Sequence, residues 1–109
     1  MKSHYVLGRS REHNFINMTR RHGWFAHRCT GSGGGEPKKK VRPIDVICLK
    51  KGHEPRLVQV SKKRGDITEA EIVELWRLAE KTGAVPVLVY KNGNRFASVD
   101  ARNNSPIEW

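Results

Sequence analysis

Two stretches carry most of the structural information in this chain, Pro43-Ile44-Asp45-Val46-Ile47 and Gln59-Val60-Ser61-Lys62. They lie in segments 43–49 and 56–62, which are rich in Val, Ile and Leu and are joined by a short run that contains Gly and Pro. This pattern predicts an antiparallel hairpin with both strands in the middle of a sheet. Asp45 then opens one strand, and Gln59 and Ser61 lie on the next.

The segment before the hairpin combines a helix with a strand. Residues 9–22 predict a helix that Gly23 closes, and residues 24–29 predict a strand. Residues 30–41 are rich in Gly and then in Lys, which predicts a flexible loop without packing residues. On the 3.6-residue period of the helix, one carboxylate points the same way as the apolar side chains, because that face carries Glu12, Phe15, Ile16 and Thr19.

A second helix follows the hairpin. Thr68-Glu69-Ala70-Glu71 is a capping box, in which Thr68 caps the free amides and Glu71 reaches back, and the helix ends near Gly83. We expect its apolar stripe to form part of a subunit interface as well as part of the core. The stripe consists of Ile72, Leu75, Trp76 and Ala79.

Two strands and an irregular tail complete the chain. Residues 85–90 and 95–99 flank Asn92-Gly93, a strong hairpin signal. The tail, residues 101–109, has no regular pattern, and we expect it to fray or to dock Ile107 and Trp109 on a partner subunit. The predicted order is helix, three strands, helix and two strands, within one α/β domain of 109 residues.

The net charge of +10 is unevenly distributed along the chain. Residues 1–65 carry 16 Lys and Arg against 4 Asp and Glu, whereas residues 66–109 carry 5 against 7. A solvated basic face would be the simplest explanation, but twelve net positive charges in 65 residues favour a polyanionic partner. Nucleic acid fits better than a membrane surface, because no long apolar run or basic amphipathic helix accompanies the charge.

The cysteines and the chain start bear on the cellular compartment. Cys29 and Cys48 lack metal-ligand spacing, and we expect both to be reduced core residues. No stretch has the length of a signal peptide core or a bilayer span. We therefore expect an intracellular, cytoplasmic protein, associated with the nucleoid or made in the cytoplasm of an infected host.

Four stretches, in this order and spacing, resemble the archaeal-type Holliday junction resolvases, a family that also occurs in viruses and phages. They are residues 8–12, 22–32, 44–47 and 83–88, and the similarity covers roughly residues 8–99. The resemblance implies a restriction-endonuclease-like fold, with a central mixed five-stranded sheet flanked by helices. It also implies a PD-(D/E)xK site, a homodimer, and nicking of four-way DNA junctions with Mg²⁺, or with Mn²⁺ in its place.

The resemblance also assigns roles to individual residues. Asp45 and Glu12 are the expected metal ligands, with the side-chain carbonyl of Gln59 and the main-chain carbonyl of Val60 as neutral partners. No nucleotide cofactor is expected, because the Gly-rich segment lacks the GK[ST] ending of a P-loop. The expected catalytic residues are Glu12, Arg28, Ser32, Asp45, Gln59, Ser61 and Lys62. The expected DNA contacts are Arg9, Arg11, His13, Arg28, Ser32, Lys38, Lys39, Lys40, Arg42, Lys62, Lys63 and Arg64.

The sequence departs from the family pattern in the catalytic triplet. Gln59 stands in place of the acid, and Ser61 in place of the lysine that orients water and offsets developing charge. Lys62 can reach the metal only if a bulge shifts the strand by one residue, and otherwise it is a phosphate contact. Asp45 itself could be a simple strand-end cap. The family pattern also differs at His13, where arginine is usual, and at Leu78 and Thr82, where aromatic residues are common.

Three functions remain open at this point. The first is a dimeric, metal-dependent endonuclease that acts on branched DNA. The second is a structure-specific DNA-binding protein that has lost cleavage, and the third is a general nuclease without preference for junctions. The presence of Glu12, Arg28 and Asp45 favours the endonuclease, since binding alone needs no paired carboxylates near phosphate.

Overall fold

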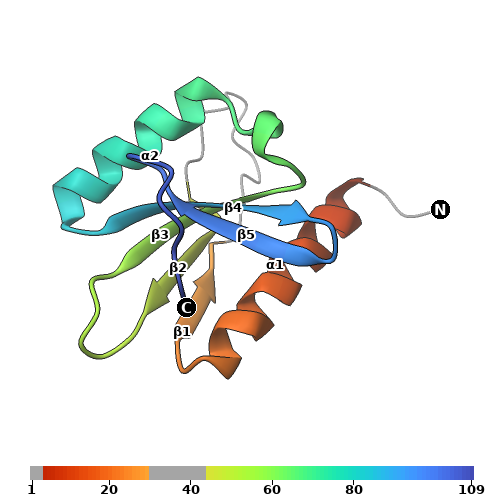
Figure 1. The fold of residues 1–109 in the computed structure, drawn as a ribbon, viewed down its shortest axis with the longest axis horizontal. Helices are drawn as coiled ribbons and strands as arrows, with labels where there is room; N and C mark the ends of the chain where they lie inside the picture. Colours follow the sequence, from red (N-terminus) through yellow and green to blue (C-terminus); the bar gives the residue numbers. More distant parts are fainter. Residues whose placement is uncertain (1–3, 30–43) are drawn as a thin grey trace, which may run out of the picture.

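The computed structural model describes residues 4–29 and 44–109, and within these ranges it describes side chains from Ser10 onward. The predicted order of elements is confirmed, with one added 3-10 turn (Figure 1). The elements are α1 (His4–Arg21), β1 (Phe25–Arg28), β2 (Val46–Leu49), β3 (Arg56–Ser61), η1 (Arg64–Asp66), α2 (Glu69–Thr82), β4 (Val85–Asn92) and β5 (Arg95–Asp100).

Helix α1 begins at His4, earlier than the predicted start at residue 9. The helix therefore runs through Gly8. A glycine inside a helix costs only about 1 kcal/mol relative to alanine, so one glycine does not end a helix.

The five strands form a mixed sheet in the order β1-β2-β3-β4-β5. Neighbouring strands are antiparallel, except that β3 and β4 are parallel because α2 forms the crossover between them. Strands β2 and β3 lie in the interior of the sheet, as predicted. Both faces of β3 must then be covered, and its residues from Leu57 to Ser61 are all buried.

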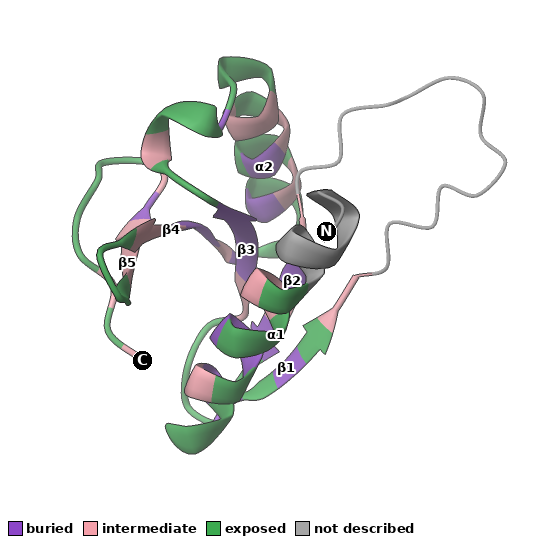
Figure 2. Cartoon of the chain, turned by 90° about the vertical axis from the view of Figure 1, so that its right-hand side faces the viewer, coloured by how far each residue is buried: buried purple, intermediate pink, exposed green. Residues whose placement is uncertain are grey.

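The two helices cover opposite faces of the sheet (Figures 1 and 2). Phe15 and Ile16 of α1 pack against one face, with Val58 and Val60 of β3. Leu75 and Ala79 of α2 pack against the other face, with Leu57 of β3. Alternate residues of β3 therefore face alternate helices, as the period of a strand requires.

The capping box of α2 is present. The Glu71 amide donates to Thr68 Oγ1 at 3.1 Å, and the Thr68 amide donates to Glu71 Oε1 at 2.9 Å. The helix ends at Gly83, whose φ of 72° is the left-handed conformation that glycine adopts without strain. These caps fix where α2 begins and ends, and each is worth about 1 kcal/mol.

The tail after β5 folds back onto its own chain, which corrects the expectation that it frays or docks on a partner subunit. The Ile107 amide donates to the Ser98 carbonyl at 2.8 Å. Trp109 donates from its ring nitrogen to Ser98 Oγ at 2.8 Å, and its carbonyl accepts the Trp24 ring N–H at 2.9 Å. Arg56 lies over both tryptophan rings, 4.3 Å and 4.6 Å from their centroids. Hydrogen bonding and cation–π contacts thus dock the tail within one subunit.

Across the part of the chain that the structure describes, no helix combines the length and the apolar character needed to cross a membrane. Both cysteines are free thiols, with Cys48 buried and Cys29 half-buried.

Candidate active site

Three strand ends meet at one end of the sheet and bring the predicted site residues together. Because β2 is antiparallel to both β1 and β3, the end of β1, the start of β2 and the end of β3 coincide. The Cys29 amide donates to the Asp45 carbonyl at 2.8 Å, and the Asp45 amide donates to the Val58 carbonyl at 2.8 Å. These bonds hold Asp45 between the two neighbouring strands.

Asp45 is a half-buried carboxyl group in an environment that disfavours its charge. Its pKa is raised from 3.8 to about 6, chiefly because burial removes water from the carboxylate. The Val60 amide, which donates to Asp45 Oδ2 at 2.8 Å, lowers this pKa. Two nearby carboxylates, Glu12 and Glu71, raise it, and Arg28 lowers it. The net result is a concentration of negative charge that a cation would relieve.

Glu12 and Arg28 form an ion pair beside this carboxyl group. Glu12 lies on the sheet-facing side of α1, as its helical period predicts, and Arg28 reaches it from the end of β1. The Arg28 Nε donates to Glu12 Oε1 at 2.6 Å, and the two side chains are 22% and 18% exposed. A charge-assisted hydrogen bond of this length fixes both groups in place. The structure therefore brings Glu12, Arg28 and Asp45 together.

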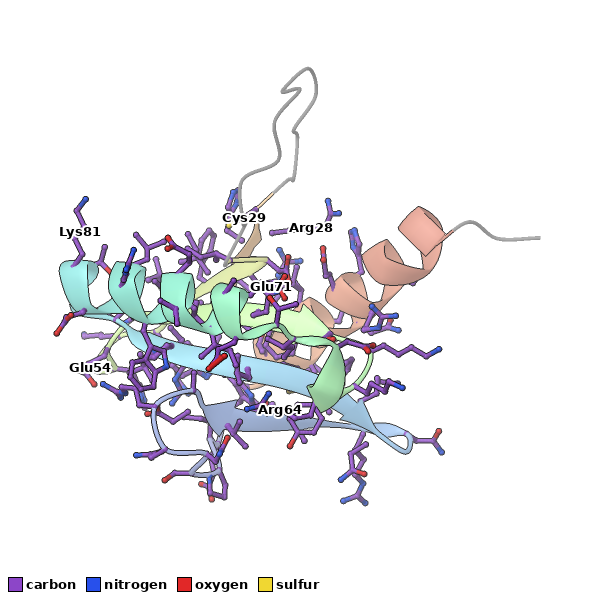
Figure 3. All side chains as sticks on the ribbon, turned by 90° about the horizontal axis from the view of Figure 1, so that it is seen from above. Arg28, Cys29, Glu54, Arg64, Glu71 and Lys81 are labelled. Atoms are coloured by element: carbon purple, nitrogen blue, oxygen red, sulfur yellow. The ribbon has the colours of Figure 1, made fainter. Side chains whose placement is uncertain are left out.

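Gln59 lies on the α2 side of the sheet, where it meets a residue whose site contact the sequence did not predict. Its Nε2 donates to Glu71 Oε2 at 3.4 Å. Sequence analysis identified Glu71 only as a capping residue. The short distance in sequence between the end of β3 and Glu71 was the signal that could have revealed this contact. A helix that begins soon after β3 starts at the same end of the sheet as the site. Figure 3 shows Arg28 and Glu71 near the N-terminal end of α2, and Lys81 at the far end of that helix.

The pairing of β3 with β4 is regular as far as Ser61. Strand β3 pairs with β4 one residue to one, from Arg56 opposite Val85 to Ser61 opposite Tyr90. Just beyond the strand, the Lys91 amide donates to the Lys62 carbonyl at 3.3 Å, whereas the register of the strands would pair that amide with the Ser61 carbonyl. Lys62 is exposed and lies in a bend after β3, so the alternation of the strand does not fix its side, and its part in the site stays a prediction.

Ser61 is engaged locally. Its hydroxyl donates to the Lys63 carbonyl at 3.0 Å, so its side chain closes the turn after β3. The next basic residues differ in exposure, since Lys63 is exposed and Arg64 is half-buried. On α1, Arg11 is half-buried and His13 is exposed. Several predicted contacts lie outside the described residues, as does the whole of the predicted loop 30–41. These contacts are Ser32, Lys38, Lys39, Lys40, Arg42 and the side chain of Arg9.

Comparison with known proteins places this arrangement in a family. A family model described as archaeal Holliday junction resolvase (Hjc) matches residues 3–104 of this chain. The chain belongs to the archaeal Holliday junction resolvase family. The resemblance noted from sequence is thereby confirmed, and the chain is a resolvase, an endonuclease that acts on DNA junctions. Among curated proteins, none matches this chain.

A solved structure supports the fold. The Holliday junction resolvase Hjc of Archaeoglobus fulgidus, an archaeal hyperthermophile, is similar with a TM-score of 0.67. The two sequences are 17% identical, and the match covers 85% of this chain and 76% of that one. At this identity the likeness shows the fold alone, and it confirms the predicted restriction-endonuclease-like architecture.

Resolvases of this family generally use divalent metal ions, and the donors of this chain suit such an ion. Asp45 and Glu12 carry carboxylate oxygens, and the Gln59 side chain carries an amide carbonyl oxygen. Hard oxygen donors are those that Mg²⁺ and Mn²⁺ prefer. Within residues 4–29 and 44–109, however, no group of three or more His, Cys, Asp and Glu side chains forms a ready metal site. Among the described residues, the site therefore has few acidic side chains for binding a metal ion.

Proposed function

We propose that this resolvase nicks four-way DNA junctions with Mg²⁺, held by Asp45 and Glu12 and assisted by Gln59 and the Val60 main-chain carbonyl. One observation carries the proposal. A half-buried aspartate at a strand end, with a pKa raised to about 6, lies beside a second carboxylate and an arginine. The ionised form of Asp45 costs the fold stability in that arrangement, whereas a cation site uses its charge.

The residues of the site divide the work. A bound divalent ion would lower the pKa of a water molecule and offset charge on the phosphate. Asp45 and Glu12 would hold the ion at the sheet end. Arg28, which pairs with Glu12, would face the phosphate as the nearby cation, because Ser61 has no charge. Ser32 would assist at the phosphate, as the family resemblance implies.

Basic residues around this end of the sheet would hold the DNA arms. His13, Lys62 and Lys63 are exposed and available for phosphate contact. They would act together with Arg9, Arg11, Arg64 and the basic run Lys38, Lys39, Lys40 and Arg42. Each phosphate neutralised contributes about −0.9 to the slope of log affinity against log salt. Binding to a junction should therefore weaken steeply with salt.

We also propose that two copies assemble on the DNA, because two symmetric nicks need two sites and the chain provides one. The predicted apolar stripe of α2 is buried in the core at some residues and exposed to solvent at others. Leu75 and Ala79 are buried in the core, whereas Trp76 is 44% exposed and Val73 is 42% exposed. These two line a groove of about 510 Å³ that offers a surface for a second copy. A monomeric mass at micromolar concentration, on and off DNA, would contradict this.

One observation favours the non-cleaving alternative, namely the lack of a lysine on the site face of β3. The deciding experiment is a gel assay of purified protein with a labelled four-way junction and a linear duplex, with and without Mg²⁺ and Mn²⁺. The proposal predicts paired nicks in the junction only when the metal is present. Tight binding without cleavage in either metal would make the chain a binding protein. Equal cutting of junction and duplex would make it a general nuclease.

A further inference from the structure

The carboxylate of Glu71 makes two separate sets of contacts. Its Oε1 accepts the Thr68 amide at 2.9 Å and the Thr68 hydroxyl at 3.1 Å, which completes the capping box. Its Oε2 accepts the Gln59 amide at 3.4 Å. The cap therefore uses one oxygen, and the other is directed toward strand β3 at the site.

We infer that Glu71 supplies the third acidic group of the active site, in place of the carboxylate that is absent at Gln59. This inference rests on the proposed metal-dependent function. Glu71 comes from the first turn of α2, so the acid would have moved from the strand to the helix that packs beside it.

The pairing of Gln59 with Glu71 explains why the strand residue is an amide. A carboxylate at residue 59 would stand within contact distance of the Glu71 carboxylate, and two like charges at that separation repel. An amide donates a hydrogen bond instead. The pair thus keeps one negative charge at this part of the site, and with Glu12 and Asp45 the number of acidic groups is three.

Hydrogen bonds to strand β3 place Glu71 near the site. Its Oε2 accepts from Gln59, and the amide of Val60, the next residue of that strand, donates to Asp45 Oδ2 at 2.8 Å. Glu71 is also half-buried, which strengthens its effect on near neighbours. Glu69, in the same helical turn, is exposed.

A capping role can be separated from an ion-binding role by substitution, because a capping box accepts Gln as well as Glu at this place. Glu71→Gln should keep the cap and the fold but remove the charge. We expect its affinity for Mn²⁺, measured by electron paramagnetic resonance or calorimetry, to fall about tenfold or more. Glu69→Gln is the matched control and should bind Mn²⁺ as the natural chain does.

The exchange of roles between residues 59 and 71 can be tested directly. The double variant Gln59→Glu with Glu71→Gln returns the acid to the strand, and we expect it to recover most of the Mn²⁺ affinity that Glu71→Gln loses. Thermal melting monitored by circular dichroism should show the same midpoint for Glu71→Gln and Glu69→Gln within a few degrees. This comparison excludes loss of the fold as the cause.

The outcomes separate this inference from the proposed function. If Glu71→Gln binds Mn²⁺ like the natural chain while Asp45→Asn does not, Glu71 is only a cap and the metal site stands without it. If Glu71→Gln loses affinity and the double variant does not regain it, the exchange of roles is wrong. If the natural chain and Asp45→Asn bind Mn²⁺ equally weakly, both the inference and the metal-dependent function fail.

Discussion

Two aspartates at different ends of the fold, Asp45 and Asp100, are both largely withdrawn from water but have opposite surroundings. Asp100, at the end of β5, accepts three hydrogen bonds from Arg102, from the amide at 2.8 Å, Nε at 2.9 Å and Nη2 at 2.7 Å. These bonds lower the pKa of Asp100. Asp45 accepts the Val60 amide, has two carboxylates nearby, and has a raised pKa.

This difference in surroundings indicates that the charge of Asp100 stabilises the fold, whereas the charge of Asp45 is suited to binding a ligand. The charge of Asp100 is compensated by Arg102 within the same turn, and the Asn104 amide donates to the Asp100 main-chain carbonyl at 2.8 Å. These bonds stabilise the turn at which the tail folds back. The Val60 amide and Arg28 compensate the charge of Asp45 only in part, so its ionised form is costly until a cation binds. Sites of this kind are where functional residues are expected.

The largest effect should come from removing the charge of Asp45. Asp45→Asn keeps an oxygen that can accept the Val60 amide, but it removes the main anionic donor of the proposed site. We expect nicking of a four-way junction in Mg²⁺ to fall by about 100-fold or more, while affinity for the junction is kept or improved. Asp100→Asn is the control and should nick at the natural rate. Equal loss in both variants would point to folding rather than chemistry.

The second effect is on stability. Most substitutions destabilise a protein, whereas Asp45→Asn should stabilise this one at high pH. Because the pKa of Asp45 is about 6 in the folded chain and 3.8 otherwise, its contribution to stability is full below pH 3.8 and is lost as the pH rises through 6. Asp45→Asn should therefore be more stable than the natural chain at pH 8, by up to about 3 kcal/mol, with the gap closing near pH 4. Urea unfolding in EDTA measures this. A constant gap would contradict the raised pKa.

The third effect has the opposite sign, at Asp100. Its lowered pKa means that Asp100 adds stability above its unfolded pKa, and this stability is lost as the pH falls through the folded value. Asp100→Asn should be less stable than the natural chain at pH 7 by about 1 kcal/mol, a modest value because Arg102 is 51% exposed. The same urea series should show the difference shrinking at low pH. An Asp100→Asn chain more stable at pH 7 would overturn the contrast.

The smallest effect is expected at Lys62, an exposed residue just beyond β3. Lys62→Ala should reduce the salt slope of junction binding by about 0.9 and leave the nicking rate at saturating protein unchanged. Lys63→Ala, the exposed neighbour, serves as the comparison and should behave alike. A loss of nicking out of proportion to the loss of affinity, for Lys62 alone, would mean that it reaches the phosphate after all.

Much of the fold follows from local patterns. The α2 capping box, the Asn92-Gly93 hairpin and the apolar period of α1 each depend on residues close in sequence, so each prediction is confirmed. Glu12 also points to the sheet, because helical period alone decides its direction. The tail could not be predicted, since Trp109 is held by Trp24 and Ser98, contacts that only the folded sheet brings within reach.

The sequence predicted the grouping of Asp45, Glu12 and Arg28, but not the contact between Glu71 and Gln59. Asp45, Glu12 and Arg28 lie together because strand order and helix face determine their places. The role of Lys62 stays a prediction, because the regular pairing of β3 with β4 ends at Ser61 and Lys62 lies in the bend that follows. The contact of Glu71 with Gln59 depends on how α2 lies across the end of β3, which is a matter of tertiary packing.

The most direct test of the account is the titration of Asp45 itself, followed by the carbon chemical shift of its carboxyl group with and without Mg²⁺. Without metal, Asp45 should titrate near pH 6 and Asp100 below its ordinary value. With Mg²⁺, the pKa of Asp45 should fall, because the ion stabilises the carboxylate, while that of Asp100 should not move. An Asp45 that titrates near 3.8 and is unaffected by Mg²⁺ would contradict the claim that this end of the sheet is built to receive a cation.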